Sequence, residues 1–106
     1  MNEEMMNRFC DYIESIDLIN YTDVWVQPFR NDLYGRTFTP TTKDRHRIEI
    51  YDNDEQSNED ILCHELAHVI LYKMNKKQDH GKEFEEAKKL VINLLHKWKR
   101  EENTNE

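Results

Sequence analysis

The stretch 61-ILCHELAHVILYKMNKKQDHGKEF-84 joins an apolar segment to a polar connector and the start of a second amphipathic segment. Its first part is apolar on nearly every side, which predicts a central, buried helix rather than a surface helix. Ser57, with Asp60 three positions later, resembles a capping box ahead of this run. We therefore expect a helix from about residue 58 to residue 74.

This predicted helix carries polar residues at a metal-binding spacing. His64 and His68 are four positions apart, so both imidazoles project from one face and can reach a single ion at about 2.0–2.1 Å. Glu65 lies beside the first histidine, where it can contact a water molecule on the metal. The pattern is HExxH. Burying these groups without partners would be costly, and a metal ion would satisfy them.

A catalytic zinc site needs a third protein ligand and one open position. His80 is the first candidate, because it follows the polar connector and precedes Gly81, which permits a tight turn back toward the helix. Glu83 and Glu86 are the alternative third ligands, since a glutamate completes some HExxH sites.

The HExxH pattern fits hydrolysis of an amide bond. Zinc polarises the carbonyl group and lowers the pKa of its water molecule to about 7. Glu65 would act as general base and pass the proton to the leaving nitrogen. The expected cofactor is one Zn²⁺ per chain. A purely structural zinc site would favour cysteine ligands and would not need a glutamate at this position.

Apolar periodicity predicts the elements around the HExxH helix. Residues 3–19 form a predicted helix, and the segment from Gly81 onward forms another, with residues 101–106 as a frayed tail. Short strands are predicted at 24–26 and 34–38, with a turn at 20–23, and the alternation in 45–52 gives the clearest strand. The expected core-facing residues of the two flanking helices are Met6, Phe9, Ile13, Ile16, Phe84, Ala87, Val91, Leu94 and Trp98.

Composition restricts the class of protein. A chain of 106 residues suits one α+β domain over residues 1–106. The net charge of −7 and the lack of a Lys/Arg cluster make nucleic acid at most a weak partner. An acidic N-terminus and the absence of a long apolar run predict a cytoplasmic protein without a membrane span. Cys10 and Cys63 lack CxxC spacing, so we expect buried thiols. The oligomeric state is not indicated.

With these residues identified, the chain resembles the SprT-like zinc metallopeptidase domain, the protease class to which Spartan belongs. The family pairs HExxH with a downstream HGxxF element, which match 64-HELAH-68 and 80-HGKEF-84. An upstream Gly-Arg element matches 35-GRT-37, and a following strand matches 47–51, so the resemblance spans roughly 34–90.

The resemblance implies a zincin-like fold: an N-terminal helix, a sheet of about three strands, the HExxH helix and a closing C-terminal helix. It implies that His64, His68 and His80 bind zinc, that Glu65 is the general base, and that the substrate is a protein or peptide. It further implies that an extended peptide pairs with an edge strand made of Arg47, Ile48, Glu49, Ile50 and Tyr51.

The chain also departs from many members of this family. It has no cysteines for a C-terminal zinc ribbon, so repair of DNA–protein crosslinks is not carried over. Two other functions stay open at this point. One is a zinc-binding regulatory module of zincin fold with little protease activity. The other is a helical interaction protein in which HExxH arose by chance.

Overall fold

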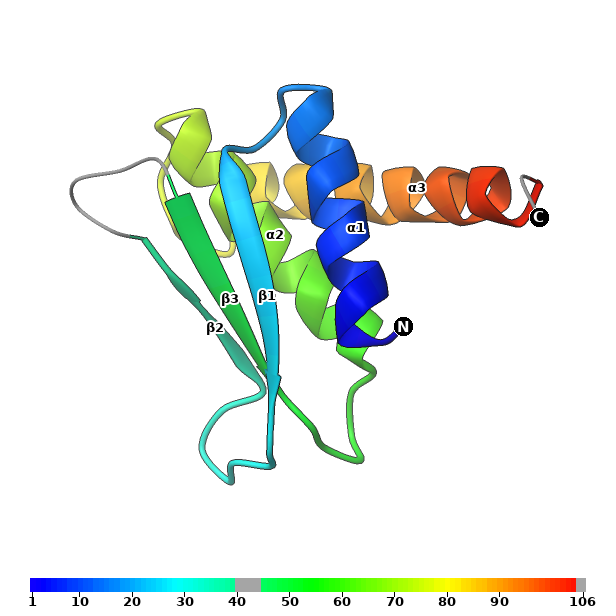
Figure 1. The fold of residues 1–106 in the computed structure, drawn as a ribbon. Helices are drawn as coiled ribbons and strands as arrows, with labels where there is room; N and C mark the ends of the chain where they lie inside the picture. The colour runs from blue at the N-terminus through cyan, green and yellow to red at the C-terminus, as the bar shows by residue number, and fades with distance from the viewer. Residues whose placement is uncertain (40–44, 105–106) are drawn as a thin grey trace.

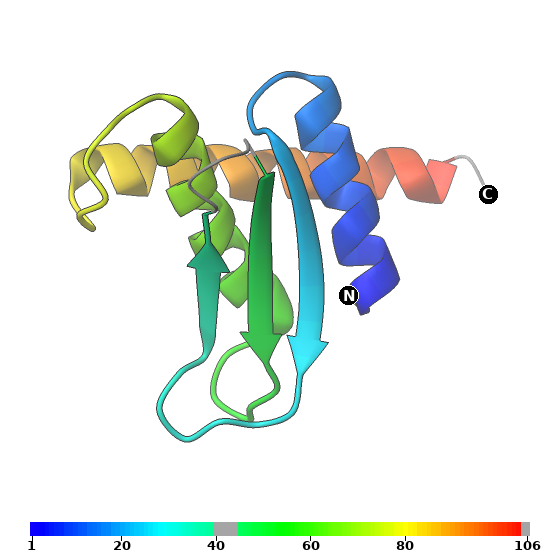
Figure 2. The ribbon, with the colours of Figure 1, turned by 60° about the vertical axis from the view of Figure 1, so that its left-hand side comes forward.

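The helices pack on one face of a small sheet, and none of the described helices covers its other face (Figures 1 and 2). The computed structural model describes residues 1–39 and 45–104. The elements are, in chain order, α1 (Glu3–Ser15), β1 (Tyr21–Gln27), β2 (Gly35–Phe38), β3 (Arg45–Tyr51), α2 (Asn58–Lys73) and α3 (Lys82–Thr104). The predicted α+β class, with its helix–strands–helices order, is confirmed.

The sheet has the strand order β1-β3-β2, with β1 and β3 parallel and β2 and β3 antiparallel. β3 is therefore the central strand, and both of its edges are paired. The predicted edge strand at Arg47, Ile48, Glu49, Ile50 and Tyr51 is wrong: the hydrogen-bonding edges of this strand are taken by β1 and β2. Among the described strands, β2 is the edge strand on the α2 side of the sheet (Figure 2).

Helix α2 occupies the centre of the molecule, as its apolar sequence predicts. It lies between the sheet and α3, which crosses behind it (Figures 1 and 2). The Ser57 side chain caps its start by accepting a hydrogen bond from the Asp60 N–H at 3.1 Å, so the predicted start of the helix is confirmed. The helix ends at Lys73, and Asn75 follows in the left-handed region with φ of 56°.

One hydrophobic core joins the helices to the inner face of the sheet. Ile48 and Ile50 of β3 are fully buried in it, together with Leu66 of α2. Its other members include Met6, Phe9, Ile13, Leu62, Ile70, Phe84, Val91, Leu95 and Trp98. Cys10 and Cys63 are buried free thiols, as predicted, and burial raises the pKa of Cys63 to about 11. Within residues 1–39 and 45–104, no helix combines the length and apolarity needed to cross a membrane.

Some predicted boundaries differ from the structure. α1 ends at Ser15, because Asp17 adopts a left-handed φ of 65°, and Ile16 is consequently 44 % exposed instead of buried. Residues 21–23 belong to β1 instead of a turn, because they pair with the start of β3. α3 continues to Thr104, so residues 101–104, predicted as part of a frayed tail, lie in the helix, and an ion pair of 2.6 Å joins Glu102 to Arg8. Residues 105–106 lie outside the described residues.

Gly35 allows β2 to lie close against α2. A Cβ atom at this position would lie 2.6 Å from Ile61 Cγ2 and 3.1 Å from the Glu49 carbonyl oxygen, and the backbone oxygen cannot move aside. We expect Gly35→Ala to lower the free energy of unfolding by about 1–3 kcal/mol, the usual range for overpacking.

Urea denaturation of the Gly35→Ala protein measures this effect. Gly81→Ala is a matched control, because its added Cβ would contact only the exposed Asp79 side chain, at 3.1 Å. Equal stabilities of the two variants would contradict the close packing of β2 on α2.

Candidate metal centre

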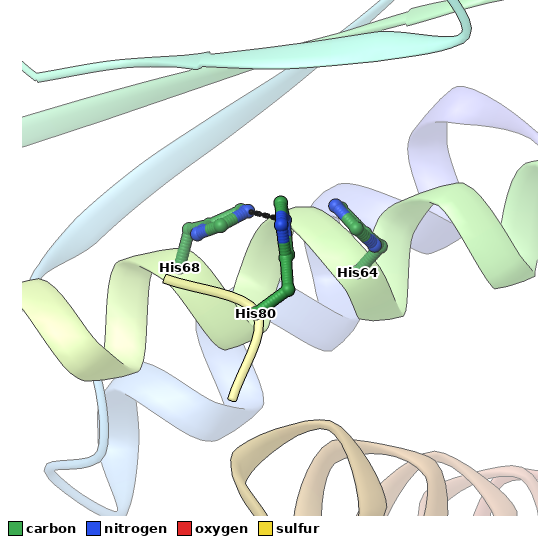
Figure 3. A group of neighbouring side chains, drawn as sticks. All are labelled: His64, His68 and His80. Carbon is green, nitrogen blue, oxygen red and sulfur yellow. Dashed lines mark hydrogen bonds between the residues drawn. The ribbon is translucent and has the colours of Figure 1, made fainter. Parts of the chain in front are cut away.

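Three histidine side chains from two parts of the chain converge at one point (Figure 3). His64 and His68 project from the same face of α2, and His80 approaches from the connector that leads into α3. One ligand atom of each histidine lies within 4.8 Å of the others, and the Nε2 atoms of His68 and His80 are 3.2 Å apart. These nitrogen atoms come close enough to share a single ion.

The arrangement fits a zinc ion. Two nitrogen ligands at about 2.0–2.1 Å in tetrahedral geometry lie about 3.3 Å from each other. The observed 3.2 Å between His68 and His80 is close to that separation. Zinc also favours imidazole donors, and three protein ligands leave the fourth position open.

The alternative third ligands lie elsewhere. The metal-capable group found among the described residues contains His80 and neither Glu83 nor Glu86. Glu83 is 3.9 Å from the Lys76 ammonium group, and both glutamates line a surface hollow beside Met74. The geometry therefore brings His80 to the HExxH pair.

The chain reversal that delivers His80 does not use a left-handed glycine. Gly81 has no positive φ, and the left-handed residue is Asn75, directly after α2. The Asp79 side chain accepts a hydrogen bond from the Gly81 N–H at 3.2 Å, which supports the turn before α3. The predicted reversal is present, but the left-handed residue in it is Asn75 and not Gly81.

Phe84 supports the three imidazole rings from within the core. It is 2 % exposed, and its ring centroid lies 4.9 Å from that of His64 and 4.8 Å from those of His68 and His80. Its predicted role as a packing residue is confirmed. Phe84 lies in the first turn of α3, four residues after His80. The HGxxF element therefore provides both a possible metal ligand and the buried ring that packs against it.

His64 favours the neutral form that binds metals. Burial, followed by the neighbouring His68 and His80 rings, lowers the pKa of His64 to about 4. An imidazole with this pKa is neutral at pH 7 and has an available lone pair, as metal ligation requires.

Glu65 lies beside the histidines and faces β2. Its side chain is 9 % exposed, and its Oε2 atom is 3.9 Å from His64 Nε2. The Thr37 hydroxyl donates a hydrogen bond of 2.8 Å to its Oε1 atom. Burial raises the pKa of Glu65, while the hydrogen bond from Thr37 opposes this shift. The carboxyl group is thus held by the edge strand at the side of the histidine cluster.

Two further residues contact the site without having been predicted to do so. Thr37 of β2 holds Glu65, and Gln78 of the connector contacts His68 through both ends of its amide group. The alternation of β2 gave a partial signal for Thr37, because it places Thr37 and Gly35 on the same face of the strand. Gln78 had no signal, because its contacts depend on the path of the connector.

Comparison with known proteins identifies the family. A sequence model of the SprT-like family matches residues 36–103, which run from β2 almost to the end of α3. The matched segment includes Thr37, Glu65 and the three histidines. No curated protein and no solved structure matches the chain. On the match over residues 36–103, the chain belongs to the SprT-like family.

Proposed function

We propose that the protein is a zinc-dependent metallopeptidase that hydrolyses peptide bonds with an activated water molecule. The proposal is carried by the convergence of His64, His68 and His80 within 4.8 Å, with the Glu65 carboxyl group beside them. Membership of the SprT-like family supports this proposal, since the family suggests a metallopeptidase-type domain. Neither nucleophilic side chains nor a covalent intermediate are required.

The three histidines would hold the ion and leave one position open to water and substrate. When bound, zinc would polarise the substrate carbonyl group and lower the pKa of water. Glu65 would accept the proton of the attacking water and deliver it to the leaving amine nitrogen. Its raised pKa suits this role, because a base with a pKa nearer neutrality also returns the proton efficiently.

The open edge of β2 suits an extended peptide. The Tyr51 N–H donates to the Tyr34 carbonyl oxygen at 2.9 Å. Antiparallel alternation then turns the N–H and C=O groups of Gly35 and Thr37 away from β3, toward the open side. A peptide that pairs there would run past Glu65 and the histidines. We therefore place the substrate edge on β2 instead of β3.

A peptide-library digest tests the proposed reaction. The zinc-loaded protein is expected to give reproducible cleavage products that disappear after chelation and return when zinc is added. Chelated protein and Glu65→Gln are the controls for contaminating proteases. Peptide binding without products would contradict the peptidase function and indicate a zinc-binding module instead. Purified protein without bound metal would contradict both.

We expect Thr37→Val to lower kcat/KM for peptide cleavage by about 10-fold, a fraction of the full general-base contribution. Valine preserves the shape of threonine but cannot donate to Glu65, whose buried carboxylate then loses its 2.8 Å hydrogen bond. Kinetics on a peptide identified in the digest measure the effect, and Thr37→Ser should restore most of the rate.

Thr22→Val is the matched control for this substitution. Thr22 likewise lies in a strand, β1, where it is buried, but its hydroxyl donates to the Asn20 carbonyl oxygen and not to Glu65. It should leave kcat/KM unchanged. An equal rate in Thr37→Val and Thr22→Val would contradict the positioning of Glu65 by β2.

A further inference from the structure

The amide group of Gln78 forms two contacts with His68. Gln78 Oε1 lies 2.9 Å from His68 Nδ1, and Gln78 Nε2 donates a hydrogen bond of 3.1 Å to the His68 carbonyl oxygen. The first contact fixes the ring, and the second fixes the amide relative to α2. Both contacts join the connector to α2, and Gln78 lies two residues before His80 in that connector.

These contacts determine which ring nitrogen of His68 carries the hydrogen. A backbone carbonyl oxygen only accepts hydrogen bonds, so the NH₂ end of the Gln78 amide must face it. The oxygen end of the amide must then face His68 Nδ1, and an amide oxygen also only accepts. His68 Nδ1 therefore carries a hydrogen, and in the neutral imidazole the lone pair lies on Nε2.

The nitrogen that is left with the lone pair is the one directed at the site. His68 Nε2 lies 3.2 Å from His80 Nε2 and faces it across the histidine cluster (Figure 3). Metal-binding histidines commonly donate their other ring N–H to an outer partner, which fixes the tautomer and the ring orientation. In this protein the side-chain amide of Gln78 is the outer partner of His68.

We propose that Gln78 is a positioning residue for metal binding, which holds His68 in the tautomer that presents Nε2 to the ion. Because Gln78 belongs to the same connector as His80, its bond to the His68 carbonyl oxygen also anchors the segment that brings the third imidazole to the helix. The inference rests on the zinc binding in the proposed function and adds a residue outside both of the matching sequence elements.

Zinc affinity and ring tautomer test this role separately. Competition titration against a chromophoric chelator gives the affinity, and we expect Gln78→Ala to weaken it by about 10- to 100-fold, as for other outer partners of metal ligands. Gln78→Glu should recover part of the affinity, because a carboxylate still accepts from His68 Nδ1 but cannot donate to the His68 carbonyl oxygen. Lys77→Ala, an exposed neighbour in the connector, should leave the affinity unchanged.

Nitrogen-15 NMR of the histidine rings in zinc-free protein gives the second readout. The wild-type protein and Gln78→Glu should show His68 with its hydrogen on Nδ1, whereas Gln78→Ala should show a mixture of the two tautomers. A loss of stability alone would not produce this change in a protein that remains folded.

Two results would overturn the role of Gln78. One is equal zinc affinity in Gln78→Ala and Lys77→Ala, and the other is an unchanged His68 tautomer in Gln78→Ala. Failure of the proposed function looks different: wild-type protein would then bind no zinc or cleave no peptide. The tautomer of the zinc-free protein would still report on Gln78 in that case.

Discussion

Glu65→Gln is expected to reduce peptide cleavage by about 10²- to 10⁴-fold, the usual contribution of a general base. Glutamine has nearly the same shape as glutamate and can still accept a hydrogen bond from the Thr37 hydroxyl group. In the wild-type protein this hydroxyl oxygen lies 2.8 Å from Glu65 Oε1. Its amide cannot take a proton from water at neutral pH. The substitution therefore removes the proton transfer and leaves the surrounding packing in place.

Zinc binding should survive this substitution. Glu65 is not among the three residues whose ligand atoms cluster within 4.8 Å, so its amide analogue should leave the ligand set complete. Initial rates on a defined peptide, together with zinc content by elemental analysis, measure both properties in one preparation. Undiminished turnover would remove Glu65 as general base, and loss of zinc would instead make it part of the metal site.

His80→Ala is expected to weaken zinc binding by more than about 100-fold, because removal of a ligand should exceed the loss of an outer partner. Two histidines would remain on α2, and a pair of imidazoles does not complete the three-ligand set of a catalytic zinc site. His80 lies on the connector and is exposed, so its removal leaves the core intact. The folded protein should therefore persist without its metal.

Glu83→Ala and Glu86→Ala are the controls for this ligand assignment. Both glutamates belong to the first turns of α3, and neither lies in the histidine cluster, so both variants should retain zinc. Full zinc occupancy in His80→Ala, with loss of zinc in one glutamate variant, would transfer the third ligand to that glutamate.

Thermal or chemical denaturation adds an independent measurement of metal binding. A ligand at 100 times its Kd raises the free energy of unfolding by about 2.7 kcal/mol when it binds only the folded state. We expect this gain for wild-type protein and its disappearance in His80→Ala.

The helices were predictable because their signals are local. The cap at Ser57 and the apolar run through α2 fix that helix without reference to the rest of the chain. The alternation in β3 likewise identified a strand with one buried face, on which His46, Ile48 and Ile50 lie. The end of α1 was less predictable, because Asp17 takes a left-handed conformation that its residue type permits but does not require.

The position of β3 within the sheet was not predictable in this way. Alternation reports which face of a strand is buried, but it does not report which strands lie on either side. β1 and β2 both pair with β3, and these pairings join segments separated by up to 24 positions in the sequence. The predicted edge strand was consequently assigned to β3, which is the central strand of the sheet.

By itself the sequence determined the chemistry that the helix can offer. The four-residue spacing of His64 and His68 fixes their common face, because helical geometry depends only on sequence separation. Glu65 follows from the same geometry. The sequence also named His80 as the first candidate for a third ligand but left Glu83 and Glu86 open. The tertiary structure brings His80 to the pair, Thr37 to the carboxyl group and Gln78 to the ring of His68. Such contacts depend on how the connector and the edge strand pack against α2, and no periodicity in the chain encodes that packing.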